Sequence, residues 1–129
     1  MFAEVKESLP VSGNDYDAQI IREIKACALD LTTSAEIVLP GTISIKRTRK
    51  QAGILSGGAE EWVITDNSTL KDELIITAIA TWCNMRIGNP PNYENLLRAY
   101  ESLKGQLRVS RRYTRFRGGG ADDEDAYQL

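Results

Sequence analysis

Apolar residues between positions 17 and 33 recur at intervals of three and four, which is the spacing of one face of an α-helix. The repeating positions are Ile20, Ile21, Ile24, Cys27, Ala28 and Leu31. The opposite face carries charged residues such as Arg22 and Lys25 and is expected to face water. Asp15 or Asp17 can cap the start of the helix. The pattern therefore predicts an amphipathic helix of about 15 residues.

The same spacing returns twice in the second half of the chain. It recurs first at Leu70, Leu74, Ile75, Ala78, Ile79, Trp82 and Cys83, and then at Tyr93, Leu96, Leu97, Tyr100, Leu103 and Leu107. Any residue from 66 to 69 can cap the first of these helices, which is expected to be the central element of the core. Gly88 and Asn89 end it, and Pro90 and Pro91 suit the first turn of the next helix. Such a short connection predicts an antiparallel helical pair.

Residues 35 to 67 interrupt the helical pattern. β-branched residues cluster near Ile43 and Val63, and a glycine-rich stretch separates the two clusters. This arrangement predicts a β-hairpin or two short strands, with the tip between residues 50 and 58. A short helix is also expected over residues 3 to 8. The predicted fold class is mainly α, a small bundle of three to four helices with a long β-hairpin-like excursion between the first long helix and the central helix.

The length of 129 residues suits one domain. The apolar period ends at Val109, and the glycines at 118 to 120 are followed by the acidic run from 122 to 125. We therefore expect a helical domain over residues 1–110, which includes the excursion at 35–67, and a flexible C-terminal tail over residues 111–129.

Charge is distributed unevenly along the chain. The 16 Lys and Arg nearly balance the 18 Asp and Glu, so the whole molecule is no obvious binder of polyanions. Residues 46–50 and 104–117, however, contain basic residues and no acidic ones. No segment is apolar and long enough for a signal peptide or a membrane span, so we expect a cytosolic protein without membrane contact. In that reducing compartment Cys27 and Cys83 are expected to be buried thiols.

Most catalytic chemistry is disfavoured. The chain has no histidine, which is the commonest general base and metal ligand at neutral pH. The segment Gly53–Gly58 lacks the Lys and Ser or Thr of a phosphate-binding Walker loop, and the acidic run 122–125 lacks the ligand spacing of an EF-hand. We expect no enzyme activity, no cofactor and no metal.

Two segments have the composition of contact surfaces. In residues 108–117 arginines alternate with the rings of Tyr113 and Phe116, which suits a protein partner, contacts to nucleic acid, or simply a solvated helix end; the protein partner is favoured. The basic stretch 46–50 is likewise a solvated strand face, a DNA contact or an interface between subunits. The interface is favoured because a two-stranded ribbon is marginal by itself in water.

The stretch from Leu70 to Thr114 resembles the head-tail connector proteins of long-tailed phages, also called adaptor or head-completion proteins. The likeness rests on the apolar helix, the hinge Gly88-Asn89-Pro90-Pro91-Asn92-Tyr93, the second helix and the basic-aromatic ending. It extends more weakly to residues 17–33. The long excursion and the acidic ending after Gly120 have no counterpart in that pattern.

The resemblance implies a structural subunit that forms a ring, twelvefold when assembled, beneath the portal, where it extends the DNA channel and offers a platform to the stopper or tail-completion protein. It implies a virion location at the head-tail junction, with the host cytoplasm as the site of assembly. The portal-docking residues would be Arg108, Arg111, Arg112, Tyr113, Arg115, Phe116 and Arg117. The ring-interface or channel residues would be Ile43, Ile45, Lys46, Arg47, Arg49, Lys50 and Trp62, with non-specific contact to DNA in the channel. The alternative is a small nucleic-acid-binding accessory protein that uses the same two segments.

Overall fold

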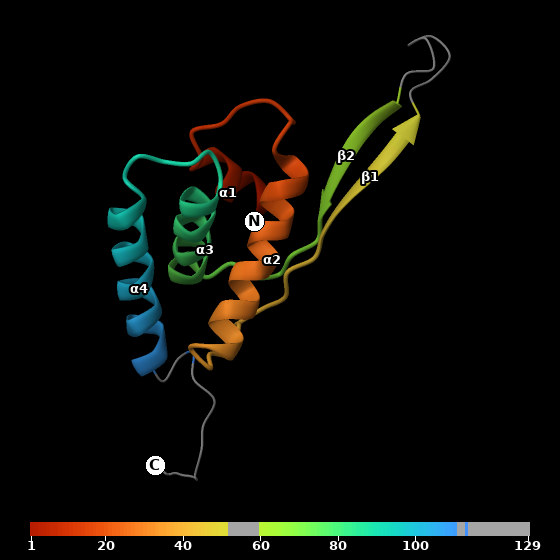
Figure 1. Cartoon of the computed structure of the whole chain (residues 1–129). Coiled ribbons are helices and arrows are strands. Elements are labelled where there is room, and N and C mark those ends of the chain that lie inside the picture. The colour runs from red at the N-terminus through yellow and green to blue at the C-terminus, as the bar shows by residue number, and fades with distance from the viewer. Residues whose placement is uncertain (52–59, 111–112, 114–129) are drawn as a thin grey trace.

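A computed structural model of the chain describes residues 1–51, 60–110 and 113. Its elements, in chain order, are α1 (Phe2–Glu7), α2 (Asp17–Thr33), β1 (Ile45–Gln51), β2 (Glu60–Asp66), α3 (Glu73–Arg86) and α4 (Tyr93–Val109). Helices α2, α3 and α4 lie side by side, and the ribbon formed by β1 and β2 projects away from them (Figure 1). The predicted order of elements is therefore confirmed, as is the antiparallel pairing of the two strands.

Helix α2 buries the stripe that its sequence pattern predicts. Ile20, Ile24, Cys27 and Leu31 are inaccessible to solvent. Its N-cap position is held by Tyr16, whose side chain makes no capping hydrogen bond. Asp17 is instead the first helical residue, and it is buried and ion-paired with Lys6 of α1 at 2.8 Å. The carboxylate of Asp17, a predicted cap of the helix, thus forms a tertiary contact that joins α1 to α2.

Helix α3 starts later than its pattern predicts. Asp72 is the N-cap, and its Oδ1 accepts hydrogen bonds from the backbone N–H of Leu74 at 3.0 Å and of Ile75 at 3.1 Å. Leu70 precedes the helix but is still buried, so it belongs to the core without being helical. The prediction that a residue from 66 to 69 caps this helix is wrong.

Residues 66 to 69 close the base of the ribbon instead. The backbone N–H of Asn67 donates to the carbonyl of Ser44 at 2.8 Å, and the hydroxyl of Ser68 accepts from the N–H of Ser44 at 2.9 Å. Gly41 passes so close to this segment that an added Cβ would lie 2.7 Å from the Cα of Leu70. The connection before β1 and the one after β2 are therefore bound to each other.

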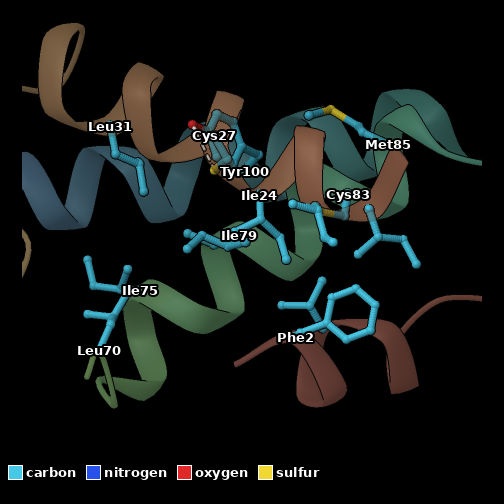
Figure 2. Packing of buried hydrophobic residues seen from close by; sticks show 14 of the residues in the cluster. Phe2, Ile24, Cys27, Leu31, Leu70, Ile75, Ile79, Cys83, Met85 and Tyr100 are labelled. Carbon is cyan, nitrogen blue, oxygen red and sulfur yellow. Dashed lines mark hydrogen bonds between the residues drawn. The ribbon is translucent and has the colours of Figure 1, made fainter. Parts of the chain in front are cut away.

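The core lies between the helices. Figure 2 shows Ile24 of α2 and Ile79 of α3 pointing into the space between the two helices, and Tyr100 of α4 lying beside Cys27 of α2. Cys27 and Cys83 are free and buried, which confirms their prediction as buried thiols. Burial raises the pKa of Cys27 to about 12 and also raises the pKa of Cys83, so both thiols stay protonated at neutral pH.

Polar contacts also connect the three long helices. The hydroxyl of Tyr100 donates to Oδ2 of Asp30 at 2.6 Å, and Lys104 Nζ donates to the same oxygen at 3.1 Å. Trp82 of α3 packs edge-on against Tyr100, with 5.2 Å between ring centroids, and its indole N–H donates to Glu23 Oε1 at 3.0 Å. Because each buried polar atom here has a partner, the network adds specificity without leaving a desolvated group.

Candidate interaction surface

One face of the ribbon combines apolar and basic residues. Arg49 is opposite Trp62, Arg47 opposite Ile64, and Ile45 opposite Asp66. Since side chains alternate between the two faces of a strand, these six residues share one face, and Lys46, Thr48, Val63 and Thr65 occupy the other. Ile45 at the base is buried, whereas Trp62 towards the tip keeps 46% of its surface exposed. The shared face therefore runs from the core out into solvent.

Two arginines contact Trp62 on this face. The guanidinium carbon of Arg47 lies 3.8 Å from the centre of the indole, and that of Arg49 lies 4.9 Å from it. A cation over an indole face is attracted by the ring quadrupole, so these contacts hold the two guanidiniums in place. We call Arg47, Arg49 and Trp62 the arginine–tryptophan face. Its geometry suits carboxylates or phosphates, which bind guanidinium, and flat groups that stack on a ring.

A groove of 380 Å³ separates β1 from the first half of α2. Its lining consists of Ala18, Ile21, Lys25, Ile45, Lys46, Arg47 and Thr48, and we call it the basic groove. The buried Ile21 and Ile45 contribute an apolar part, while the exposed Lys25 and Lys46 contribute positive charge. Among the described residues that line it there is no acidic side chain. The Nε of Arg47 is buried and has no hydrogen-bond acceptor in the described part of the chain.

The residues that we expected at a ring interface divide into two groups. Ile43 packs against the core and Ile45 is buried, so both are structural. Lys46, Arg49 and Trp62 are exposed and Arg47 is half-buried, so these four can meet a partner. The side chain of Lys50 lies outside the described residues. The arginine–tryptophan face thus consists of three of the seven residues predicted for the ring interface.

Tyr113 differs from its prediction as an exposed anchor. It is 3% exposed, and its hydroxyl donates to the carboxylate of Asp72, with 2.9 Å to either oxygen. Its carbonyl accepts a hydrogen bond from the N–H of Val38 at 2.6 Å. The ring therefore belongs to the core, and the chain still contacts the helical domain three residues beyond the predicted boundary at 110. The physical reason is that a tyrosine beside a helix-capping carboxylate satisfies both its apolar ring and its hydroxyl.

The other predicted tail residues are largely outside the described part. Arg108 is exposed in the last turn of α4. Arg111, Arg112, Arg115, Phe116 and Arg117 lie outside the described residues, as do positions 52–58 of the tip predicted between residues 50 and 58 and the tail from 114 onward. Asp72, the N-cap of α3, also fixes Tyr113 by accepting the hydrogen bond from its hydroxyl.

The apolar face of α4 is only partly covered. Tyr100 and Leu107 are buried, and Leu96 and Leu103 pack partly against the core, but Tyr93 and Leu97 are exposed. These last two residues are one helical turn apart and share a side of α4. They form a second apolar surface, and within residues 1–51, 60–110 and 113 no cation lies over the ring of Tyr93 as two arginines do over Trp62.

Neither a metal site nor a membrane helix appears in the described ranges. Within residues 1–51, 60–110 and 113, the His, Cys, Asp and Glu side chains form no group of three or more that could hold a metal ion. The helices in the same ranges are too short or too polar to cross a membrane. Comparisons of the chain with protein-family models, with curated proteins and with solved structures find no match.

Proposed function

We propose that this protein is a structural subunit of the head-tail connector of a long-tailed phage. In this proposal its helices form a small bundle, and copies assemble as a ring, twelvefold when complete, beneath the portal. The ring extends the DNA channel and gives the stopper or tail-completion protein a docking platform. The observation that carries the proposal is the arginine–tryptophan face, held on a ribbon that extends beyond the helices.

The exposure of Trp62 supports a contact between copies. Tryptophan and arginine are the residues most enriched where a few side chains supply most of the binding energy of an interface. On this ribbon they are arranged before any partner arrives, so less side-chain entropy is lost on binding. A ring needs one surface of each copy to meet a different surface of the next, and a projecting ribbon suits such a head-to-tail contact.

The segment after α4 has a second role in the proposal. Tyr113 is held on its own domain, so we no longer assign it to the portal contact; it fixes the position from which the chain continues. Arg108, Arg111, Arg112, Arg115, Phe116 and Arg117 remain the proposed portal-docking residues. Many such weak contacts around a ring make a tight joint, although each one is weak alone. The protein acts without catalysis or cofactor, in the host cytoplasm during assembly and in the virion afterwards.

The test is attachment to DNA-filled, portal-bearing heads that lack tails. Wild-type protein should co-sediment with these heads and appear as an added ring below the portal in electron micrographs. Arg49→Glu should abolish the ring, because it reverses a charge beside Trp62. Ser102→Glu is the matched control: it adds the same side chain at an exposed position of α4, away from the ribbon, and should leave the ring intact.

Portal docking is tested separately from ring contacts. The combined variant R111Q/R112Q/R115Q/R117Q keeps Tyr113 and removes four charges, and it should fail to co-sediment with the heads. The variant R22Q/R98Q removes exposed charges on α2 and α4 and should bind as the wild type does. Full attachment of the first variant contradicts the portal role of the tail.

The alternative function is that of a nucleic-acid-binding accessory protein, and the same face favours it. Two guanidiniums beside a half-exposed indole can hold phosphates while a base stacks on the ring. The two functions differ in their salt dependence and their partner. If the protein shifts free DNA with an affinity that falls steeply with salt and ignores portal-bearing heads, the connector proposal is rejected.

A further inference from the structure

We infer that the acidic segment Asp122–Asp125 of the chain binds back into its own basic groove between α2 and β1. The inference concerns the isolated subunit and does not depend on the connector function. It assigns an occupant to the groove and a role to the part of the sequence that the proposed function leaves unused.

The groove has the chemistry of a site for carboxylates. Lys25 from α2 and Lys46 and Arg47 from β1 line the groove. No acidic side chain in the described residues lines the groove, and the buried Nε of Arg47 has no acceptor among them. The positive charge that Lys25, Lys46 and Arg47 bring to the groove therefore suits an occupant with carboxylates.

The acidic segment has the complementary charge. Asp122, Asp123, Glu124 and Asp125 are consecutive, and no basic residue occurs from position 118 to 129. Tyr127 and Leu129 follow, and their apolar side chains suit the surface that Ile21 and Ile45 contribute to the groove. The chain thus contains both a positively charged stretch in β1 and a negatively charged segment at 122–125.

The chain is long enough for the contact. Tyr113 is fixed to Val38, just beyond the end of α2. The nine residues from 114 to 122 reach about 30 Å when extended. The groove borders α2 from Ala18 to Lys25, which is about 12 to 23 Å of helix rise from Thr33. A segment tethered within reach of its site has a high effective concentration, which favours binding within one chain over binding between copies.

The consequence is that the free subunit covers part of its own basic surface. Acidic residues in the groove compete with any anionic partner for Lys46 and Arg47. Exposed charge pairs are screened by salt, so the contact should weaken as ionic strength rises. An anionic partner that binds the ribbon should displace the segment.

The experiment measures paramagnetic broadening in the full-length protein. Ala126→Cys receives a nitroxide label, while Cys27 and Cys83 stay unlabelled because they are buried. We expect a loss of intensity at the backbone amides of 18–25 and 45–48 relative to the reduced label. The loss should disappear at about 1 M salt, where the Debye length is about 3 Å. It should also disappear when D122N/D123N/E124Q/D125N is added to the labelled chain.

Two controls decide the outcome. Glu101→Gln, which removes an exposed acid on α4, should leave the broadening unchanged. A mixture of unlabelled, isotope-enriched chain with labelled, unenriched chain should show no broadening at the groove. Broadening only in that mixture would mean that a second copy supplies the segment, and it overturns the inference. Groove amides that keep full intensity in the labelled chain overturn it as well. Either result leaves the head-attachment experiment unaffected.

Discussion

The helical domain and the ribbon use their tryptophans in opposite ways. Trp82 is half-buried between α3 and its neighbours, donates a hydrogen bond to Glu23 and packs edge-on against Tyr100. Trp62 lies on the ribbon, where the guanidiniums of Arg47 and Arg49 lie over its ring. The side chain remains 46% exposed. Both rings are large apolar surfaces, but only the first is satisfied within the domain.

The difference indicates where stability and binding are located in this chain. The helices bury most of their apolar residues against one another, and this burial is a main source of the stability of the domain. The ribbon buries its base at Ile45 and leaves its outer part to solvent. Because a two-stranded ribbon gains little stability by itself, a contact with another molecule can stabilise its outer part. Substitutions in the two regions should therefore separate effects on folding from effects on binding.

The largest expected effect is in the helical core. Ile79→Ala removes a fully buried side chain between α2 and α3 and should lower the free energy of unfolding by about 2 to 5 kcal/mol. Urea denaturation followed by circular dichroism measures this loss. A decrease below about 1 kcal/mol would contradict the placement of the core, because cavities of this kind are more costly.

An intermediate effect is expected where the chain after α4 returns to the domain. Tyr113→Phe keeps the ring but removes the hydrogen bond to Asp72, which should cost about 1 to 3 kcal/mol because the acceptor is charged. Thermal and urea unfolding report the change. Tyr93→Phe is the matched control, since Tyr93 is exposed, and it should unfold as the wild type does. Equal stability of both variants would show that residue 113 is not part of the folded domain.

The smallest effect on stability is expected on the ribbon. Trp62→Ala removes two exposed cation–π contacts and should cost about 0.5 to 1 kcal/mol. In the same preparation, attachment to portal-bearing heads should be lost. A large loss of stability together with unchanged attachment would contradict this prediction. It would mean that Trp62 contributes to folding and not to binding.

Local patterns accounted for most of the fold. The helices over 17–33, 73–86 and 93–109 follow the apolar spacing, because that spacing reports which face of a helix leaves water. The antiparallel strands follow from β-branched residues on both sides of a glycine-rich stretch. The start of α3 was missed, because residues 66–69 have capping side chains that the ribbon base uses for hydrogen bonds to residues 42–44.

The candidate surface was only partly predictable. The basic and aromatic residues of β1 and β2 are visible in the sequence, and their placement on an antiparallel pair was expected. Their register was not, and it is the register that puts Arg49 opposite Trp62 and leaves Arg47 close to the same ring. The basic groove combines residues of α2 with residues of β1 that are twenty or more positions away. No local pattern indicates such a combination.

The order and character of the elements, the burial of both thiols and the charges available for contact were determined by the sequence alone, because periodicity and composition are local properties. Three features were decided only by the tertiary structure: Asp72 caps α3, Tyr113 is buried beside it, and Trp62 lies against two arginines. In each case, several polar or charged groups could pair with the same residue, and their positions in the folded chain decide which of them does. That competition is settled when distant segments come together, since a polar group that loses water must find its partner among whatever the fold brings near.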